Sequence, residues 1–97
     1  MHYDEFIRSL AENKLPDNLN PALQSLWYDG KDNWDMSHDI AQEIHDNNGS
    51  WIHAYLHRKE GDQWNANYWY QRAGRKMPKA PLNQEWEALV QEFLSPA

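Results

Sequence analysis

Apolar residues recur at spacings of three and four along most of the chain, which is the pattern of amphipathic helices. The pattern predicts helices over about residues 2–13, 21–29, 33–47, 51–60, 63–73 and 84–94. No stretch alternates apolar and polar residues over the length of a strand. We therefore expect one all-α domain over residues 1–97, with about six short helices. Two helix-pair units, at about 21–48 and 50–74, are flanked by N- and C-terminal amphipathic helices.

Polar residues and glycines mark the predicted helix ends. The expected N-caps are Asn20, Asp32 or Asn33, Ser50, Asp62 and Asn83. The expected C-terminal stops are Gly30, Gly61 and Gly74. We interpret Asn47-Asn48-Gly49 as a break between two helices. In the last helix, Trp86, Leu89, Val90, Phe93 and Leu94 form the predicted buried stripe, and Glu85 and Glu92 are expected outside it.

Residues 21–44 and 51–74 repeat one plan, in which a short helix is followed by Gly, Asp, a Trp two residues after the Asp, and a second helix. Trp34 and Trp64 occupy matching positions, and each is expected to fill the seam inside its own helix pair. The second unit contains Trp-Tyr at 69–70, followed by a basic residue and Ala, and it resembles a tetratricopeptide or Sel-like repeat. That resemblance implies stacked helix pairs.

A second resemblance rests on the stretch His-Ala-Tyr-Leu-His-Arg-Lys-Glu-Gly-Asp, from His53 to Asp62. It is similar to a stretch found in small bacterial proteins of unknown function. No activity follows from that resemblance.

Composition excludes several classes of protein. The net charge of −6 argues against nucleic-acid binding, which depends on neutralising phosphates. The absence of cysteine excludes disulfides, thiolate metal sites and cysteine nucleophiles. A mean hydropathy of −1.03, without a long apolar run, argues against a membrane span. An acidic pair within the first six residues is unlike a secretion signal, so we expect a cytoplasmic protein.

Histidines provide the one cluster with candidate chemistry. His53, His57 and Glu60 share a stripe of the predicted fourth helix, and two histidines four residues apart can bind one metal ion. His38 would approach them if the third and fourth helices pack together. The alternative is a hydrogen-bonded packing stripe without a metal, which is the interpretation favoured here. We therefore expect no cofactor and no resident metal, and we assign no catalytic residue.

A second group of residues combines aromatic and basic side chains near the predicted fifth helix. The candidate binding residues are Trp64, Tyr68, Arg72, Arg75 and Lys76. They favour a non-catalytic helical module that binds a protein partner or a second copy of the chain. The alternative function is a small metal-binding or acid/base enzyme centred on His53, His57 and Glu60.

Overall fold

Six α-helices make up most of the computed structural model, which describes residues 1–94. The helices are α1 (Tyr3–Ala11), α2 (Pro21–Gly30), α3 (Trp34–Gln42), α4 (Asn47–Glu60), α5 (Gln63–Arg72) and α6 (Leu82–Leu94). No strand occurs among the described residues, so the predicted all-α class with about six helices is confirmed. In that same range, no helix has the length and the apolar character that crossing a bilayer requires.

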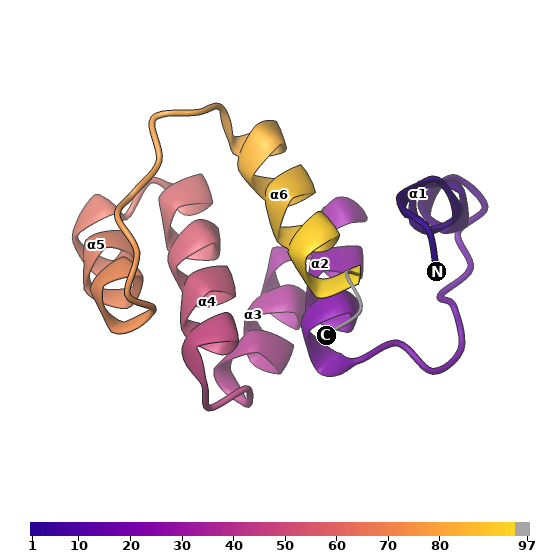
Figure 1. Cartoon of the computed structure of the whole chain (residues 1–97), viewed down its shortest axis with the longest axis horizontal. Helices are drawn as coiled ribbons and strands as arrows, with labels where there is room; N and C mark the ends of the chain where they lie inside the picture. The colour runs from indigo at the N-terminus through magenta and orange to yellow at the C-terminus, as the bar shows by residue number, and fades with distance from the viewer. Residues whose placement is uncertain (95–97) are drawn as a thin grey trace.

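The helices are arranged around α4 (Figure 1). This helix packs against α5 on one side and against α3 on the other, and α2 packs on the outer side of α3. The connection over residues 73–81 returns from α5 to α6, which lies against both α2 and α4. At the end of the molecule opposite α5, α1 contacts α6. The two histidine-bearing helices, α3 and α4, are therefore neighbours.

Apolar side chains from all six helices form one core. Its fully buried members include Phe6, Leu26, Ile52, Leu56, Tyr70, Leu89 and Val90. The rings of Trp27, Trp51 and Tyr55 are also buried, and each has a polar atom that forms a hydrogen bond. Several of the abundant aromatic residues thus supply apolar surface and bond through their polar ends at the same time.

Three of the predicted N-caps are confirmed. The side chain of Asn20 accepts a hydrogen bond from the backbone N–H of Leu23 at 2.8 Å. Asn33 and Asp62 cap α3 and α5 in the same way. At the end of α4, Gly61 adopts a φ of +91°, the left-handed conformation that glycine reaches at no steric cost. Short-range signals therefore set these helix ends.

The predicted boundary between the third and fourth helices is wrong. The third helix ends at Gln42 rather than near Asn47, and α4 begins at Asn47 with Asp46 as its N-cap in place of Ser50. The carboxylate of Asp46 accepts from two backbone N–H groups, at 2.9 and 3.1 Å. Gly49 lies inside α4, and a Cβ there would lie 1.9 Å from the carbonyl oxygen of Ile44. The glycine marks a close approach of two backbones and not a break.

Two other helix ends differ from the prediction. Gly30 is the last residue of α2, and the chain turns two residues later at Asp32, which has a φ of +60°. Asn83 is already inside α6. The backbone N–H groups of Gln84 and Glu85, at the start of this helix, donate to the carbonyl oxygen of Pro81.

The expected equivalence of Trp34 and Trp64 is not observed. Trp64 is 77% exposed and fills no seam. Trp34 is half-buried, and its Nε1 donates to the carbonyl oxygen of Leu56 at 2.9 Å, on α4 rather than within its own helix pair. The two units match in sequence pattern, but the surroundings of the two rings differ. Trp34 on α3 faces the neighbouring helix α4, whereas Trp64 on α5 faces solvent.

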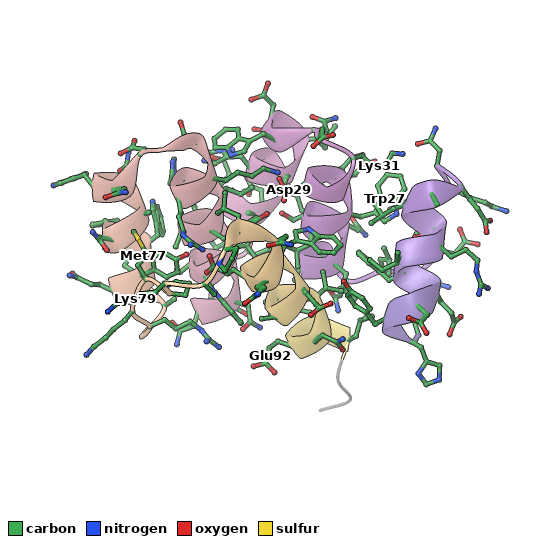
Figure 2. All side chains as sticks on the ribbon, turned by 90° about the horizontal axis from the view of Figure 1, so that it is seen from above. Trp27, Asp29, Lys31, Met77, Lys79 and Glu92 are labelled. Carbon is green, nitrogen blue, oxygen red and sulfur yellow. The ribbon has the colours of Figure 1, made fainter. Side chains whose placement is uncertain are left out.

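Two buried carboxylates connect the helices in a way that the sequence pattern did not predict. Asp29, on α2 (Figure 2), accepts from the hydroxyl of Tyr55 at 2.7 Å and from Nζ of Lys59 at 2.9 Å. Glu85, expected on the outer face of its helix, is only 4% exposed. Its carboxylate accepts hydrogen bonds from Trp51, Arg58 and Tyr70. The expectation for Glu85 is wrong because partners from α4 and α5 satisfy its charge inside the fold.

Candidate metal centre

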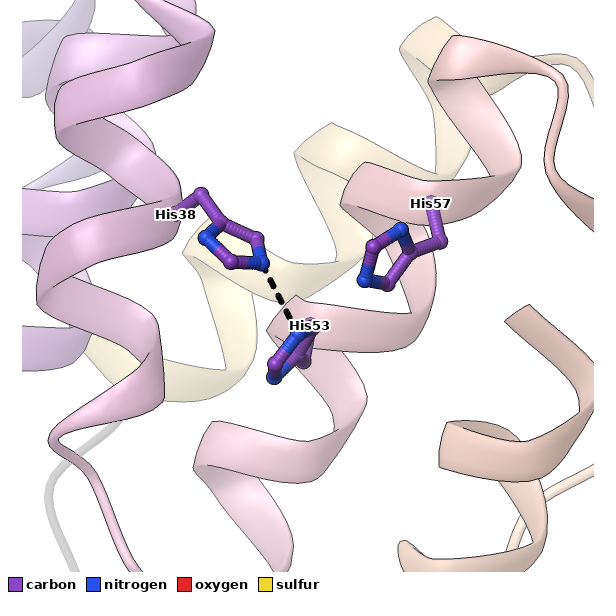
Figure 3. A group of neighbouring side chains, drawn as sticks. All are labelled: His38, His53 and His57. Atoms are coloured by element: carbon purple, nitrogen blue, oxygen red, sulfur yellow. Dashed lines mark hydrogen bonds between the residues drawn. The ribbon is translucent and has the colours of Figure 1, made fainter. Parts of the chain in front are cut away.

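Three histidines from two helices meet on one side of α4. His53 and His57 are one helical turn apart on α4, and His38 projects from α3 (Figure 3). One ring nitrogen from each lies within 4.8 Å of the others. The i, i+4 spacing accounts for the pair on α4. The packing of α3 against α4 adds the third ring, so the expected approach of His38 is confirmed.

His38 and His53 form a direct hydrogen bond. Their Nε2 atoms are 2.9 Å apart, so one ring donates its N–H to the bare nitrogen of the other. The two rings meet edge to face, with centroids 4.5 Å apart. A single proton therefore occupies the space between two nitrogen lone pairs, which is the place where a metal ion would bind.

Glu60 lies behind His57 and not among the converging nitrogens. Its Oε2 accepts a hydrogen bond from Nδ1 of His57 at 2.9 Å. This contact places the proton of His57 on Nδ1 and leaves the lone pair of Nε2 free. A carboxylate in this position orients a ligating imidazole and raises its basicity. Of the four predicted candidate ligands, three histidines converge, and Glu60 supports one of them.

Two tryptophans hold the histidine rings. Trp34 stacks on His38 with centroids 4.8 Å apart and planes inclined by 13°. Trp69 stacks on His53 at 3.9 Å and 10°. Trp34 is itself anchored to α4 by its hydrogen bond to a backbone carbonyl. Sequence reasoning missed this role, because neither ring follows the histidines at a recognisable spacing; Trp34 precedes His38 by one turn, which is the only local signal.

Burial and mutual repulsion keep His38 and His53 uncharged. Burial, together with the nearby rings of His38 and His57, which disfavour a second positive charge, lowers the pKa of His53 to about 4. Burial also lowers the pKa of His38, with His57 adding to the effect and Asp39 and Glu60 opposing it. At neutral pH both rings are uncharged, which is the protonation state that binds metals.

The donor set restricts the ions that fit. Three neutral imidazoles suit Zn²⁺, Cu²⁺ and Ni²⁺, whereas Mg²⁺ and Ca²⁺ prefer oxygen ligands. Three protein ligands would leave a fourth position on a tetrahedral ion for water or another ligand. All three nitrogens lie within 4.8 Å of one another, so rotation of the side chains is needed to bring them to one centre.

The aromatic and basic candidates divide into two groups. Trp64, Tyr68 and Arg72 follow one another along the exposed side of α5, where Nη1 of Arg72 donates to the hydroxyl of Tyr68 at 3.2 Å. The rings of Trp64 and Tyr68 stack with centroids 6.4 Å apart. Arg75 instead lies over the ring of Trp51, 3.4 Å from its centroid.

Lys76, the last of these candidates, is an exposed residue of the connection that follows α5.

Comparison with models of protein families, with curated proteins and with solved structures found no match to this chain. The geometry of these sites is therefore what indicates a function.

Proposed function

We propose that this protein binds one divalent transition-metal ion of the zinc class through His38, His53 and His57. The observation that carries the proposal is the convergence of three imidazole nitrogens from two helices within 4.8 Å. The hydrogen bond from Nδ1 of His57 to Glu60 supports the proposal, because it leaves the lone pair of Nε2 of His57 available to bind a metal ion. The ion takes the place of the hydrogen bond between His38 and His53, and the ring that donates this bond shifts its proton from Nε2 to Nδ1. Binding then links the α2–α3 and α4–α5 helix pairs.

The test is a zinc titration of the untagged full-length chain against a chromophoric chelator. We expect one zinc ion per chain and a rise in melting temperature with zinc concentration, since the ion binds the native state. His38→Gln, His53→Gln and His57→Gln should each abolish the rise. His45→Gln is the matched control, because the side chain of His45 is 81% exposed and its carboxylate neighbour, Glu43, lies outside the cluster.

Glu60→Gln provides a finer test of the site. It removes the charge behind His57 without removing a ligand, and it should weaken zinc binding by about 10- to 100-fold. Equal zinc affinity in the wild-type protein and in the variants of His38, His53 and His57 would overturn the proposal. A stoichiometry well below one ion per chain would also overturn it.

A second function is favoured by the exposed face of α5. Trp64 is 77% and Tyr68 46% exposed, and large aromatic side chains are enriched where proteins bind one another. On this proposal the chain is a helical interaction module that binds a protein partner or its own copy through these two rings. Sedimentation equilibrium tests self-association: Trp64→Ala and Tyr68→Ala should shift any dimer to monomer while leaving the melting temperature nearly unchanged. A dimer that persists in both variants argues against a role of this face.

A further inference from the structure

A polar pocket adjoins the histidine cluster on the side of His53. It has a volume of about 340 Å³ and lies between the α3–α4 connection, the first turns of α4 and the last turns of α5. Its polar lining includes Asp46, Asn47, Ser50, His53 and Arg72, and its apolar lining includes Ala41, Ile44 and Trp69. His53 thus belongs both to the histidine cluster and to the wall of this pocket.

The two nitrogens of His53 face different surroundings. Nε2 bonds to His38, and the other ring nitrogen points away from His57, toward the N-terminal half of α4 (Figure 3). That half of α4 supplies Asn47 and Ser50 to the pocket. His53 lines the pocket although the residue is only 8% exposed, and the ring nitrogen that does not bond to His38 is the polar atom that it offers there.

A metal ion on Nε2 fixes the proton of His53 on Nδ1. A neutral imidazole carries one proton, and when one nitrogen ligates a metal the other becomes the N–H donor. Without the ion, the hydrogen bond to His38 permits His53 to be donor or acceptor at Nε2, and Nδ1 is then either bare or protonated. Metal binding therefore makes Nδ1–H of His53 a permanent hydrogen-bond donor on the wall of the pocket.

Arg72 supplies a second donor on the same pocket. Its guanidinium lies 5.1 Å from the ring centroid of Trp69 and 5.9 Å from that of Tyr68, and one nitrogen is bonded to the hydroxyl of Tyr68. The two rings restrict the orientation of the guanidinium, and its remaining N–H groups can bind a carboxylate in the two-point geometry that arginine favours.

We propose that the metal-loaded protein binds a small organic monocarboxylate in this pocket, between Arg72 and Nδ1–H of His53. A monoanion fits better than a phosphate dianion, because the carboxylate of Asp46 also lines the pocket. The side chains of Ala41, Ile44 and Trp69 provide contact for a short apolar body. This inference rests on the proposed metal binding, and it adds that metal and carboxylate increase each other's affinity, since coupling between two sites is reciprocal.

The experiment measures the zinc dissociation constant of the untagged chain at increasing butyrate, with inorganic phosphate as a parallel probe. We expect saturating butyrate to tighten zinc binding by about fivefold or more, within the usual range of coupling between sites. Free butyrate competes weakly for zinc, so its direct effect has the opposite sign. Arg72→Gln should bind zinc as the wild type does but lose the response to butyrate. Arg75→Gln, whose guanidinium lies over Trp51, is the matched control and should retain the response.

The outcomes separate the two proposals. Zinc binding at the triad that butyrate leaves unchanged overturns the coupled pocket and leaves the proposed function standing, whereas failure of zinc to bind overturns the proposed function itself. An undiminished response in Arg72→Gln assigns the carboxylate to the metal ion alone and overturns the pocket. A response to phosphate as large as that to butyrate overturns the proposed ligand class.

Discussion

Gly49 shows how tightly a single residue can constrain this fold. It is buried in the first turn of α4, and the carbonyl oxygen of Ile44 occupies the place where a Cβ would stand. The sequence alone suggests a break between two helices at this glycine. In the structure, the absence of a side chain is what permits the α3–α4 connection to fold back onto α4.

Gly49→Ala should therefore destabilise the protein. In an open helix this change adds about 1 kcal/mol of stability, but here the connection must move to make room, at a cost of about 1–3 kcal/mol. Chemical denaturation measures the difference in unfolding free energy. A more stable Gly49→Ala protein would show that the two backbones are not in close contact.

His53 is the residue whose ionisation should affect stability most clearly. Its pKa is lowered to about 4 in the folded protein, so the unfolded chain, with an ordinary histidine, binds the proton more readily. The unfolding free energy is unaffected by this residue above about pH 6.5, and it decreases as the pH falls from there toward 4. The difference corresponds to about 3 kcal/mol in all.

Urea denaturation of the metal-free protein between pH 7 and pH 5 tests this expectation. The wild type should lose unfolding free energy over this interval. His53→Gln, which has no proton to gain, should show a clearly flatter profile. Parallel profiles for the two proteins would contradict a depressed pKa at His53.

At the scale of elements, α4 decides most of the structure. It carries two of the three clustered histidines, and it contacts α2, α3, α5 and α6. Its N-terminus depends on Asp46, whose carboxylate accepts from the N–H groups of Asn48 and Gly49. The negative charge of Asp46 at the N-terminus of α4 also complements the helix dipole.

Asp46→Ala should lower the unfolding free energy by about 1 kcal/mol, the usual cost of losing an N-cap side chain. Asp46→Asn is the conservative control and should restore most of the loss, because its side-chain oxygen accepts the same hydrogen bonds. Thermal denaturation of the three proteins provides the comparison. If Ser50→Ala were the more harmful change, Ser50 rather than Asp46 would be the cap.

At the scale of the whole molecule, buried carboxylates connect helices that are distant in the chain. Glu85 of α6 is bonded to Trp51 and Arg58 of α4 and to Tyr70 of α5. The side chain of Arg58 is only 15% exposed, so this ion pair is shielded from solvent. Removing one member of a buried pair leaves the other charge without compensation.

Glu85→Ala should therefore lower the unfolding free energy by about 3–5 kcal/mol. Glu92→Ala, on the same helix, is the matched control, because its side chain is 55% exposed and its contact with Arg75 is 3.8 Å long. Its effect should stay within about 0.5 kcal/mol. Similar losses in both variants would place Glu85 at the surface, as the sequence pattern first indicated.

The class of the fold and most of its helices follow from local patterns in the sequence. The spacing of apolar residues and the caps Asn20, Asn33 and Asp62 act within a few neighbouring residues, so their effect can be predicted locally. The sequence also placed His53 and His57 on one stripe, since residues four apart on a helix share a face.

Which side chains meet across helices depends on tertiary packing. Whether His38 reaches the pair on α4, and whether Glu85 is buried, depends on how α3 and α6 pack against α4. The exposure of Trp64 depends likewise on the absence of a neighbouring helix over that side of α5 in the described part of the chain. Such contacts join residues far apart in the sequence, and no local pattern of apolar and polar positions specifies them.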